Sequence, residues 1–153
     1  MGERSNKAVE LFNQGYNCSQ SVFAAFADLY GMDIETALRV SSSFGGGMGR
    51  MREVCGAVSG MFMVAGMETG TIVGRDSEGK QKNYQVVQQL AAQFREKNGS
   101  IICRELLGLP DTSHTDTKPE ARTKEYYQKR PCVQLVEEAA HILEEFLDNK
   151  KRS

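Results

Sequence analysis

The sequence predicts an all-α fold, a single compact bundle of about six helices with a central apolar helix. Apolar residues recur at helical spacing along most of the 153-residue chain, and no segment of useful length alternates as a strand does. The longest apolar run, residues 55–67, is apolar on nearly all sides, which is typical of a buried central helix. The length suits one domain, so we expect a single helical domain over residues 1–153 with a polar tail at 148–153.

The individual helices follow from their apolar stripes and their end signals. We expect helices over residues 8–12, 18–30, 34–40, 52–68, 80–97, 101–107 and 131–147. Asn17 and Gln20 have the spacing of a capping box at the start of the second helix, and Pro131 suits the first position of the last one. The polar segments at 71–79 and 110–119 are expected to be loops.

Two further patterns concern packing and the surface. Gly56 and Gly60 are one helical turn apart, as are Gly66 and Gly70, which indicates the close approach of another element. The acidic pair at 144–145 is typical of a solvated helix face. We therefore expect the glycine pairs to face the core and the acidic pair to face water.

The composition excludes several classes of function. The net charge is −1, so no general field attracts nucleic acid or anionic membranes, and we expect neither as a partner. The apolar run at 55–67 is shorter than the roughly 20 residues that span a bilayer. The first residues, MGERSNKAVELF, lack the apolar stretch of a secretory signal, so we expect a cytoplasmic protein whose thiols are kept reduced.

All four cysteines stand where the local sequence indicates that a helix begins. They are Cys18, Cys55, Cys103 and Cys132. A helix N-terminus carries partial positive charge, which stabilises a thiolate and lowers the thiol pKa below its free value of about 8.5. One cysteine at such a position means little, but four out of four indicate that sulfur is the chemistry of this protein.

Cys55 is the strongest candidate for a reactive sulfur. It follows a glycine-rich stretch and the two arginines Arg50 and Arg52, whose positive charges favour a thiolate. The charge of Glu53 opposes this effect. The alternative is that Cys55 is a small apolar core residue, since free cysteine is among the most buried residue types.

The other three cysteines lie on the apolar sides of their helices, which fits burial as well as convergence on one interior site. Cys18 is our first choice as the redox partner of Cys55, with Cys103 and Cys132 as a second pair or as resolving thiols. Four cysteines allow three pairings, and the sequence does not select one. No pair has the C-x-x-C spacing of thioredoxin-like proteins or zinc ribbons.

The glycine-rich stretch before Cys55 is a candidate anion or cofactor site, because backbone N–H groups and an arginine precede a helix N-terminus. Its residues are Gly46, Gly47, Gly49 and Arg50. The stretch lacks the Gly-Lys-Ser/Thr ending of a Walker loop, and a helix rather than a strand precedes it. A tight structural loop beside Cys55 is the alternative interpretation.

Several segments together resemble a known family. They are YNCSQSVFAAF at 16–26, FGGGMGR at 44–50 and CGAVSG at 55–60, followed by Cys103 and Cys132. In this order they resemble the C_GCAxxG_C_C family of redox-active proteins. The resemblance implies a redox role for the cysteines, with a redox-active domain over roughly residues 8–147, and no assigned substrate. In one departure, the family's name places glycine before cysteine and alanine after it, whereas here the cysteine precedes both.

The leading interpretation is a cytosolic thiol-based redox protein, a thiol-dependent oxidoreductase that carries out thiol–disulfide or electron-transfer chemistry with an unknown redox partner. Cys55 would attack a disulfide or oxidant, and a second cysteine would resolve the product. In an alternative, all four thiolates bind an iron–sulfur cluster or another thiophilic metal. The interface of a homodimer is one place where such a site would form. In a third interpretation, this is a helical interaction protein with four structural core cysteines.

Overall fold

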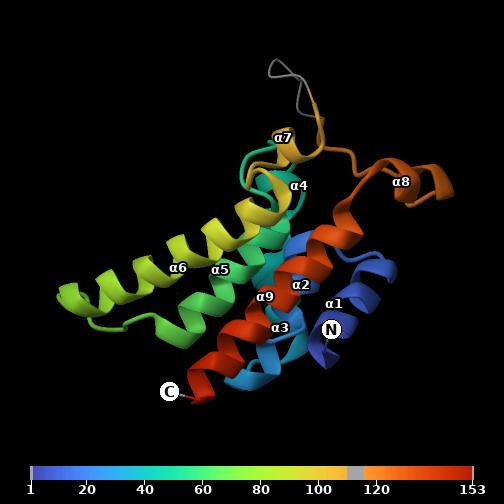
Figure 1. The fold of residues 1–153 in the computed structure, drawn as a ribbon. Helices are drawn as coiled ribbons and strands as arrows, with labels where there is room; N and C mark the ends of the chain where they lie inside the picture. The colour runs from blue at the N-terminus through green and yellow to red at the C-terminus, as the bar shows by residue number, and fades with distance from the viewer. Residues whose placement is uncertain (1, 110–115, 153) are drawn as a thin grey trace.

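The computed structural model describes residues 2–109 and 116–152 and confirms the all-α bundle (Figure 1). Its elements are α1 (Glu3–Asn13), α2 (Cys18–Ala24), the 3-10 helix η1 (Ala27–Tyr30), α3 (Ile34–Ser41), the 3-10 helix η2 (Ser42–Phe44), α4 (Gly45–Met48), α5 (Gly56–Thr69), α6 (Ser77–Asn98), α7 (Cys103–Leu106), α8 (Lys124–Lys129) and α9 (Cys132–Arg152). Within the described residues, six of these helices have seven or more residues, in agreement with the expected number. None of the helices in this part of the chain combines the length and the apolar character needed to cross a membrane.

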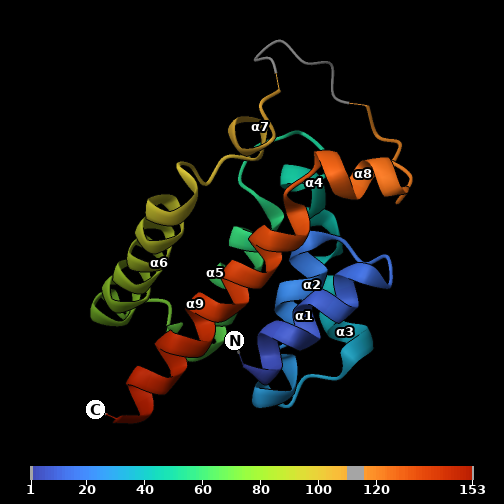
Figure 2. The ribbon, with the colours of Figure 1, turned by 45° about the vertical axis from the view of Figure 1, so that its right-hand side comes forward.

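Helix α5 lies at the centre of the bundle, as predicted from its apolar sequence. Helices α2, α6 and α9 all pack against it. Its side chains Val58, Met61 and Val64 are fully buried, because neighbouring helices cover it on several sides. Figures 1 and 2 show α4, α7 and α8 gathered at one end of the bundle, with the C-terminus at the other end. The cysteine-bearing helix starts lie at the first of these ends.

Two glycines of α5 allow the backbone of α2 to approach closely, as the sequence indicated. A Cβ atom on Gly60 would lie 2.8 Å from the Cβ of Val22, and one on Gly56 would lie 3.1 Å from the Cβ of Cys18. The expectation of close packing is wrong for the second glycine pair, Gly66 and Gly70. Nothing lies within 4 Å of a Cβ on Gly66, and Gly70 approaches only the backbone of Gly66. The close packing is therefore confined to the half of α5 that follows Cys55.

Several element boundaries differ from those expected. The predicted helix over 18–30 is divided into α2 and η1, with 3-10-type hydrogen bonds such as Phe26 N–H to Phe23 O. Helix α6 begins at Ser77, where the Asp76 carboxylate accepts a hydrogen bond from Gly79 N. Helix α9 continues to Arg152 through the predicted tail, and α8 was not expected. Residues 110–115 of the predicted loop lie outside the described residues.

Candidate functional site

The four cysteines meet at one cavity, although they come from four separate segments of the chain. Three of them, Cys18, Cys103 and Cys132, are the first residues of α2, α7 and α9, and Cys55 is the N-cap of α5. This confirms the predicted placement at helix starts. All four are free thiols and line a cavity of about 90 Å³, which we call the thiol cavity.

A left-handed turn over residues 46–50 forms one wall of the thiol cavity. All five residues have positive φ, including the non-glycine residues Met48 and Arg50. Such a conformation costs non-glycine residues roughly 1–2 kcal/mol each, so this turn is held by its surroundings. The packing around Gly47 is close: a Cβ atom on this residue would lie 2.6 Å from the Cβ of Cys103 and 2.8 Å from the Cα of Arg52. Only glycine permits this approach of the backbone to the cysteine.

A short antiparallel backbone contact places Cys55 and Cys103 at the same end of the bundle. Val54 forms an isolated β-bridge with Ile102. The Cys55 N–H donates to Ile101 O at 2.8 Å, and the Cys103 N–H donates to the carbonyl of Glu53 at 2.6 Å. The helix predicted from residue 52 therefore begins only at Gly56, because Arg52 has positive φ and the residues after it are hydrogen-bonded across to the segment before α7.

The start of α2 is fixed by the capping box that the sequence predicted. The Asn17 side chain accepts a hydrogen bond from Gln20 N at 3.0 Å, and the Gln20 side chain accepts one from Asn17 N at 3.0 Å. The close approach of Gly56 then brings Cys18 against the start of α5. A purely local signal thus positions one of the four sulfurs.

Cys18 and Cys132 are neighbouring thiols in the thiol cavity, and their pKa values change in opposite directions. The hydrogen bond from Cys18 favours the Cys132 thiolate, and the Tyr126 hydroxyl and the charges of Arg130 and Arg122 add to it, so the pKa of Cys132 falls to about 7 although burial opposes the change. The same hydrogen bond and burial raise the pKa of Cys18 well above its ordinary value. The pair therefore combines one thiol whose ionised form is favoured, Cys132, with one whose protonated form is favoured, Cys18.

Cys55 does not have the lowered pKa that the sequence predicted. Its side chain is 4% exposed, and burial raises its pKa to about 12, although the N–H groups of Val58 and Ala57 oppose this effect. Of the two upstream arginines expected to help it, Arg52 donates instead to the sulfur of Cys103 at 3.6 Å, and Arg50 donates to the carbonyl of Lys118. The N-terminal position on α5 is present, but burial outweighs it.

Cys103 is also a buried thiol rather than a favoured thiolate. It is 7% exposed, and burial raises its pKa while the hydrogen bond and the charge of Arg52 work in the opposite direction. Of the four helix starts, only that of α9 combines a cysteine with enough hydrogen-bond donors and positive charge to lower its pKa.

The sequence interpretation missed three residues that surround Cys132. Arg122 lies over the ring of Phe12 at 4.0 Å from its centroid and over the ring of Tyr126 at 5.3 Å. Tyr126 lies in α8 and Arg130 directly follows that helix. Arg122 precedes α8 and Arg130 follows it in extended backbone, so no helical spacing in the sequence marked the three residues as one group.

The residues predicted as an anion or cofactor site adjoin the thiol cavity. Gly46 and Gly47 line the thiol cavity itself. Gly46, Gly49 and Arg50 line a second, outer hollow of about 290 Å³, which we call the arginine groove. Cys132 lines both the thiol cavity and the arginine groove. The assignment of these residues to a ligand stays a prediction.

Within one copy of the chain, the thiols do not fit the alternative of a metal or iron–sulfur site. Across the residues that the structure describes, no group of three or more His, Cys, Asp or Glu side chains is placed so that it could hold a metal ion. The thiols engage other protein groups instead, Cys18 with Cys132 and Cys103 with Arg52.

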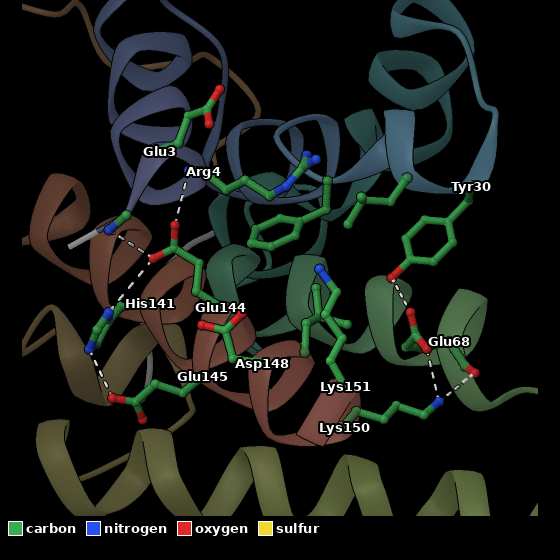
Figure 3. Close-up of a pocket in the computed structure, with 14 residues that line it drawn as sticks. Glu3, Arg4, Tyr30, Glu68, His141, Glu144, Glu145, Asp148, Lys150 and Lys151 are labelled. Carbon is green, nitrogen blue, oxygen red and sulfur yellow. Dashed lines mark hydrogen bonds and ion pairs between the residues drawn. The ribbon is translucent and has the colours of Figure 1, made fainter. Parts of the chain in front are cut away.

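A larger cavity of about 680 Å³ lies along α9 near the N-terminus of α1, and we call it the carboxylate cavity (Figure 3). Glu144 accepts hydrogen bonds there from the backbone N–H groups of Gly2, Arg4 and Ser5 at 2.9–3.2 Å, and from the Ser5 hydroxyl at 2.7 Å. The predicted solvated role of Glu144 is therefore wrong, because this carboxylate caps the start of α1 from another helix.

Glu68 is the second engaged carboxylate in this cavity. Figure 3 shows it between Tyr30 and Lys150, with the Tyr30 hydroxyl donating at 2.9 Å and the Lys150 ammonium at 2.8 Å. Glu144 and Glu68 are thus bound to groups of the protein itself. The hydrogen bonds and the ion pair of these two carboxylates join α1, η1, α5 and α9.

The fold and the converging thiols define an all-α cysteine protein, and comparison with known proteins places it in a family. Residues 16–146 match the family described as "Putative redox-active protein (C_GCAxxG_C_C)", and the chain belongs to that family. A protein of Archaeoglobus fulgidus, described as uncharacterized, is 26% identical over 152 residues, covering 95% of this chain and 93% of its own length. No solved structure gives a significant match to this chain.

Proposed function

We propose that this protein catalyses thiol–disulfide exchange through the pair Cys132 and Cys18, with Cys132 as the attacking thiolate. The observation that supports this most is the contact between the two thiols, in which hydrogen bonding and nearby positive charge lower the pKa of Cys132 to about 7. A thiol whose pKa is close to the ambient pH is near the optimum for attack on a disulfide. The proposal keeps Cys18 as a redox partner and moves the attacking role from Cys55 to Cys132.

The exchange proceeds in two balanced steps. The Cys132 thiolate attacks one sulfur of a substrate disulfide, whose S–S bond breaks, and the other substrate sulfur leaves as a thiolate that takes up a proton. Cys18 then loses its proton and attacks the Cys132 sulfur of the mixed disulfide, expelling the second substrate thiol. The substrate disulfide is reduced to two thiols, and the two cysteines are oxidised to one disulfide.

A separate thiol reductant must return this disulfide to the dithiol for a further cycle. Such reductants maintain cytosolic thiols, so the cytoplasm is the compartment in which we expect the protein to act. Cys55 and Cys103 have raised pKa values and lie deeper, so in this proposal they line the thiol cavity and take no part in the exchange.

The test uses the neutral compound bis(2-hydroxyethyl) disulfide and three single variants. Cys132→Ser should lower the rate of thiol release at least about 100-fold, because the attacking thiolate is lost. Cys18→Ser should release one equivalent of thiol and stop, with the mixed disulfide on Cys132 detected by mass spectrometry of its peptide. Cys55→Ser is the matched control, and it should retain the exchange.

The opposite pattern would overturn the assignment. If Cys55→Ser removed the exchange while Cys132→Ser retained it, the sequence-based choice of Cys55 would be restored. If the wild-type protein formed no mixed disulfide at any cysteine, thiol–disulfide exchange would be the wrong function.

A further inference from the structure

The arginine groove is the most positively charged hollow near the proposed thiolate. Its cationic side chains are Arg50, Arg52, Arg122 and Arg130. They come from the glycine-rich turn and from the segment around α8, which the fold brings together beside Cys132. The carboxylate that lines the same groove is Glu120. On the side of the groove, the ionisable groups facing Cys132 are four guanidinium groups, one carboxylate and the Tyr126 hydroxyl, and on the side of the thiol cavity they are the other three thiols.

Most of this positive charge is not neutralised by the protein. Within the described residues, Arg130 is the one of the four with a carboxylate partner, Glu120 at 3.1 Å. Arg122 donates to the backbone carbonyls of Phe12 and Tyr16, which fix its position and leave its charge in place. Arg50 donates to the carbonyl of Lys118, and its buried Nε has no hydrogen-bond partner.

Arg50 lines the groove and, among the described residues, has no carboxylate partner, so its positive charge is available to a molecule bound there. Guanidinium groups bind carboxylates and phosphates in a fork geometry. The groove of about 290 Å³ is near the lower end of small-molecule sites, which measure roughly 300–1,000 Å³. Cys132 opens into this groove as well as into the thiol cavity, so a molecule bound there has its reacting atoms beside the thiolate.

We infer that the arginine groove binds a small anionic disulfide, holding its negatively charged groups on Arg50 and Arg52 while its S–S bond faces Cys132. This inference rests on the proposed thiol–disulfide exchange and names its substrate class. A cleft lined with one sign of charge raises the rate of encounter with oppositely charged molecules by roughly 10- to 1,000-fold, and salt weakens the effect. Selectivity for anions is therefore the property that distinguishes this site from an ordinary exposed thiol.

The experiment compares three disulfides of similar size and different charge. They are 3,3′-dithiodipropionate, bis(2-hydroxyethyl) disulfide and cystamine, which carry two negative charges, no charge and two positive charges. Each rate of reaction at Cys132 is divided by the rate of the same disulfide with a free small thiol, which removes differences in intrinsic reactivity. We expect the normalised rate for the anion to exceed that for the neutral compound about tenfold at low salt, and to approach it at high salt.

The Arg50→Gln variant tests the groove directly. It should lower the anion-to-neutral ratio severalfold, and Arg50→Lys should restore part of it because the charge returns without the guanidinium fork. Arg95→Gln is the matched control, because Arg95 is an exposed arginine of α6 that does not line the groove. Its ratio should equal that of the wild type. A thermal unfolding curve of each variant shows whether the fold is retained.

A second readout does not depend on disulfide exchange. The rates of alkylation of Cys132 by iodoacetate and by iodoacetamide give the same charge comparison for a reaction in which no disulfide takes part. If bis(2-hydroxyethyl) disulfide reacts at Cys132 but neither ratio favours the anion, the inference fails and the proposed function stands. If disulfides leave Cys132 unmodified while iodoacetate is favoured, the groove binds anions and the proposed function fails. If Cys132 reacts with none of these compounds, both fail.

Discussion

The thiol cavity and the carboxylate cavity lie toward opposite ends of α9, and they treat charge in opposite ways. Near the start of α9, Cys132 is surrounded by hydrogen-bond donors and by arginine charge that a single carboxylate, Glu120, balances only in part. Further along the same helix, Glu144 and its neighbour Glu68 are bound to N–H groups, a hydroxyl and an ammonium group of the protein. The region around Cys132 therefore has positive charge that can act on a bound molecule, whereas the charges around Glu144 and Glu68 join helices of the protein.

The sizes of the two cavities would favour the carboxylate cavity, and not the thiol cavity, as the functional site. The carboxylate cavity measures about 680 Å³ and the thiol cavity about 90 Å³. Volume alone would select the larger one as the functional site. The chemistry of the lining groups favours the smaller one, because a reactive group with a changed pKa and unbalanced neighbouring charge is typical of functional sites. The thiol cavity is held by close approach of the backbone, whereas the carboxylate cavity is held by a carboxylate cap, and variants at each region distinguish the two.

The largest expected effect concerns the backbone approach at the thiol cavity. Gly47→Ala should destabilise the protein by about 3 kcal/mol, because the new Cβ meets Cys103 and the Arg52 backbone and also adopts positive φ. Gly49→Ala is the matched control: its φ is also positive, but its nearest neighbour, Ser43 O, lies 3.8 Å away, so the expected loss is roughly 1–2 kcal/mol. Urea unfolding measures both, and equal losses would show that close contact with Cys103 is unimportant.

The next effect belongs to the carboxylate cavity. Glu144→Ala should cost about 2 kcal/mol at pH 7, because three backbone N–H groups and the Ser5 hydroxyl lose a charged acceptor. Glu145→Ala, which removes an exposed neighbour paired with His141, should change the free energy of unfolding by less than about 0.5 kcal/mol. Disulfide exchange at Cys132 should be retained in both variants.

The cost of Glu144→Ala also has a predictable pH dependence. Burial raises the pKa of Glu144, but the hydrogen bonds from Ser5 and the α1 backbone outweigh it, so the folded-state pKa lies below the ordinary value. The stabilisation is therefore present above the unfolded-state pKa and is lost as the pH falls through the lowered folded-state value. Unfolding measured at pH 7 and near pH 3 should show a smaller difference between variant and wild type at the lower pH. A difference that grew in acid would contradict this cap.

The parts of the structure that the sequence predicted rest on local signals. The capping box of Asn17 and Gln20, the four cysteines at helix starts and the apolar α5 each involve residues close together in the chain. Short-range spacing carries this information, because a helix cap and an amphipathic stripe are set within one or two turns. The close packing of Gly60 against Val22 could also be predicted, since a glycine on an apolar helix allows a neighbouring element to approach closely.

The parts that the sequence did not predict depend on contacts between distant segments. Glu144 resembled a solvated residue because its partners in α1 lie about 140 positions away in the chain. Cys55 was preferred to Cys132 because Arg50 and Arg52 are its neighbours in sequence, but the fold directs Arg52 to Cys103 and buries Cys55. A thiol pKa is set by burial and by charges from other elements, so helix position alone could not rank the four sulfurs.

A smaller effect tests the hydrogen bond within the thiol pair. Cys18→Ala should raise the pKa of Cys132 by about one unit, because the thiolate loses its principal donor. Cys18→Ser is the matched control, since its hydroxyl can still donate and the rise should be smaller. The rate of alkylation of Cys132 by iodoacetamide, followed from pH 5 to pH 10, gives the pKa in each variant. If Ala and Ser shifted this profile equally, loss of the sulfur rather than of the donor would be responsible.

The smallest expected effect comes from the second donor, the Tyr126 hydroxyl. Tyr126→Phe removes this hydroxyl while keeping the ring over which Arg122 lies, so the arginine should retain its position. The pKa of Cys132 should rise by about half a unit, or roughly 0.7 kcal/mol, which is less than for Cys18→Ala. Tyr84→Phe, a change on the exposed part of α6, is the matched control and should leave the alkylation profile unchanged. An unchanged profile in Tyr126→Phe would show that the hydroxyl does not contribute, and would assign the lowered pKa to Cys18 and the arginine charges alone.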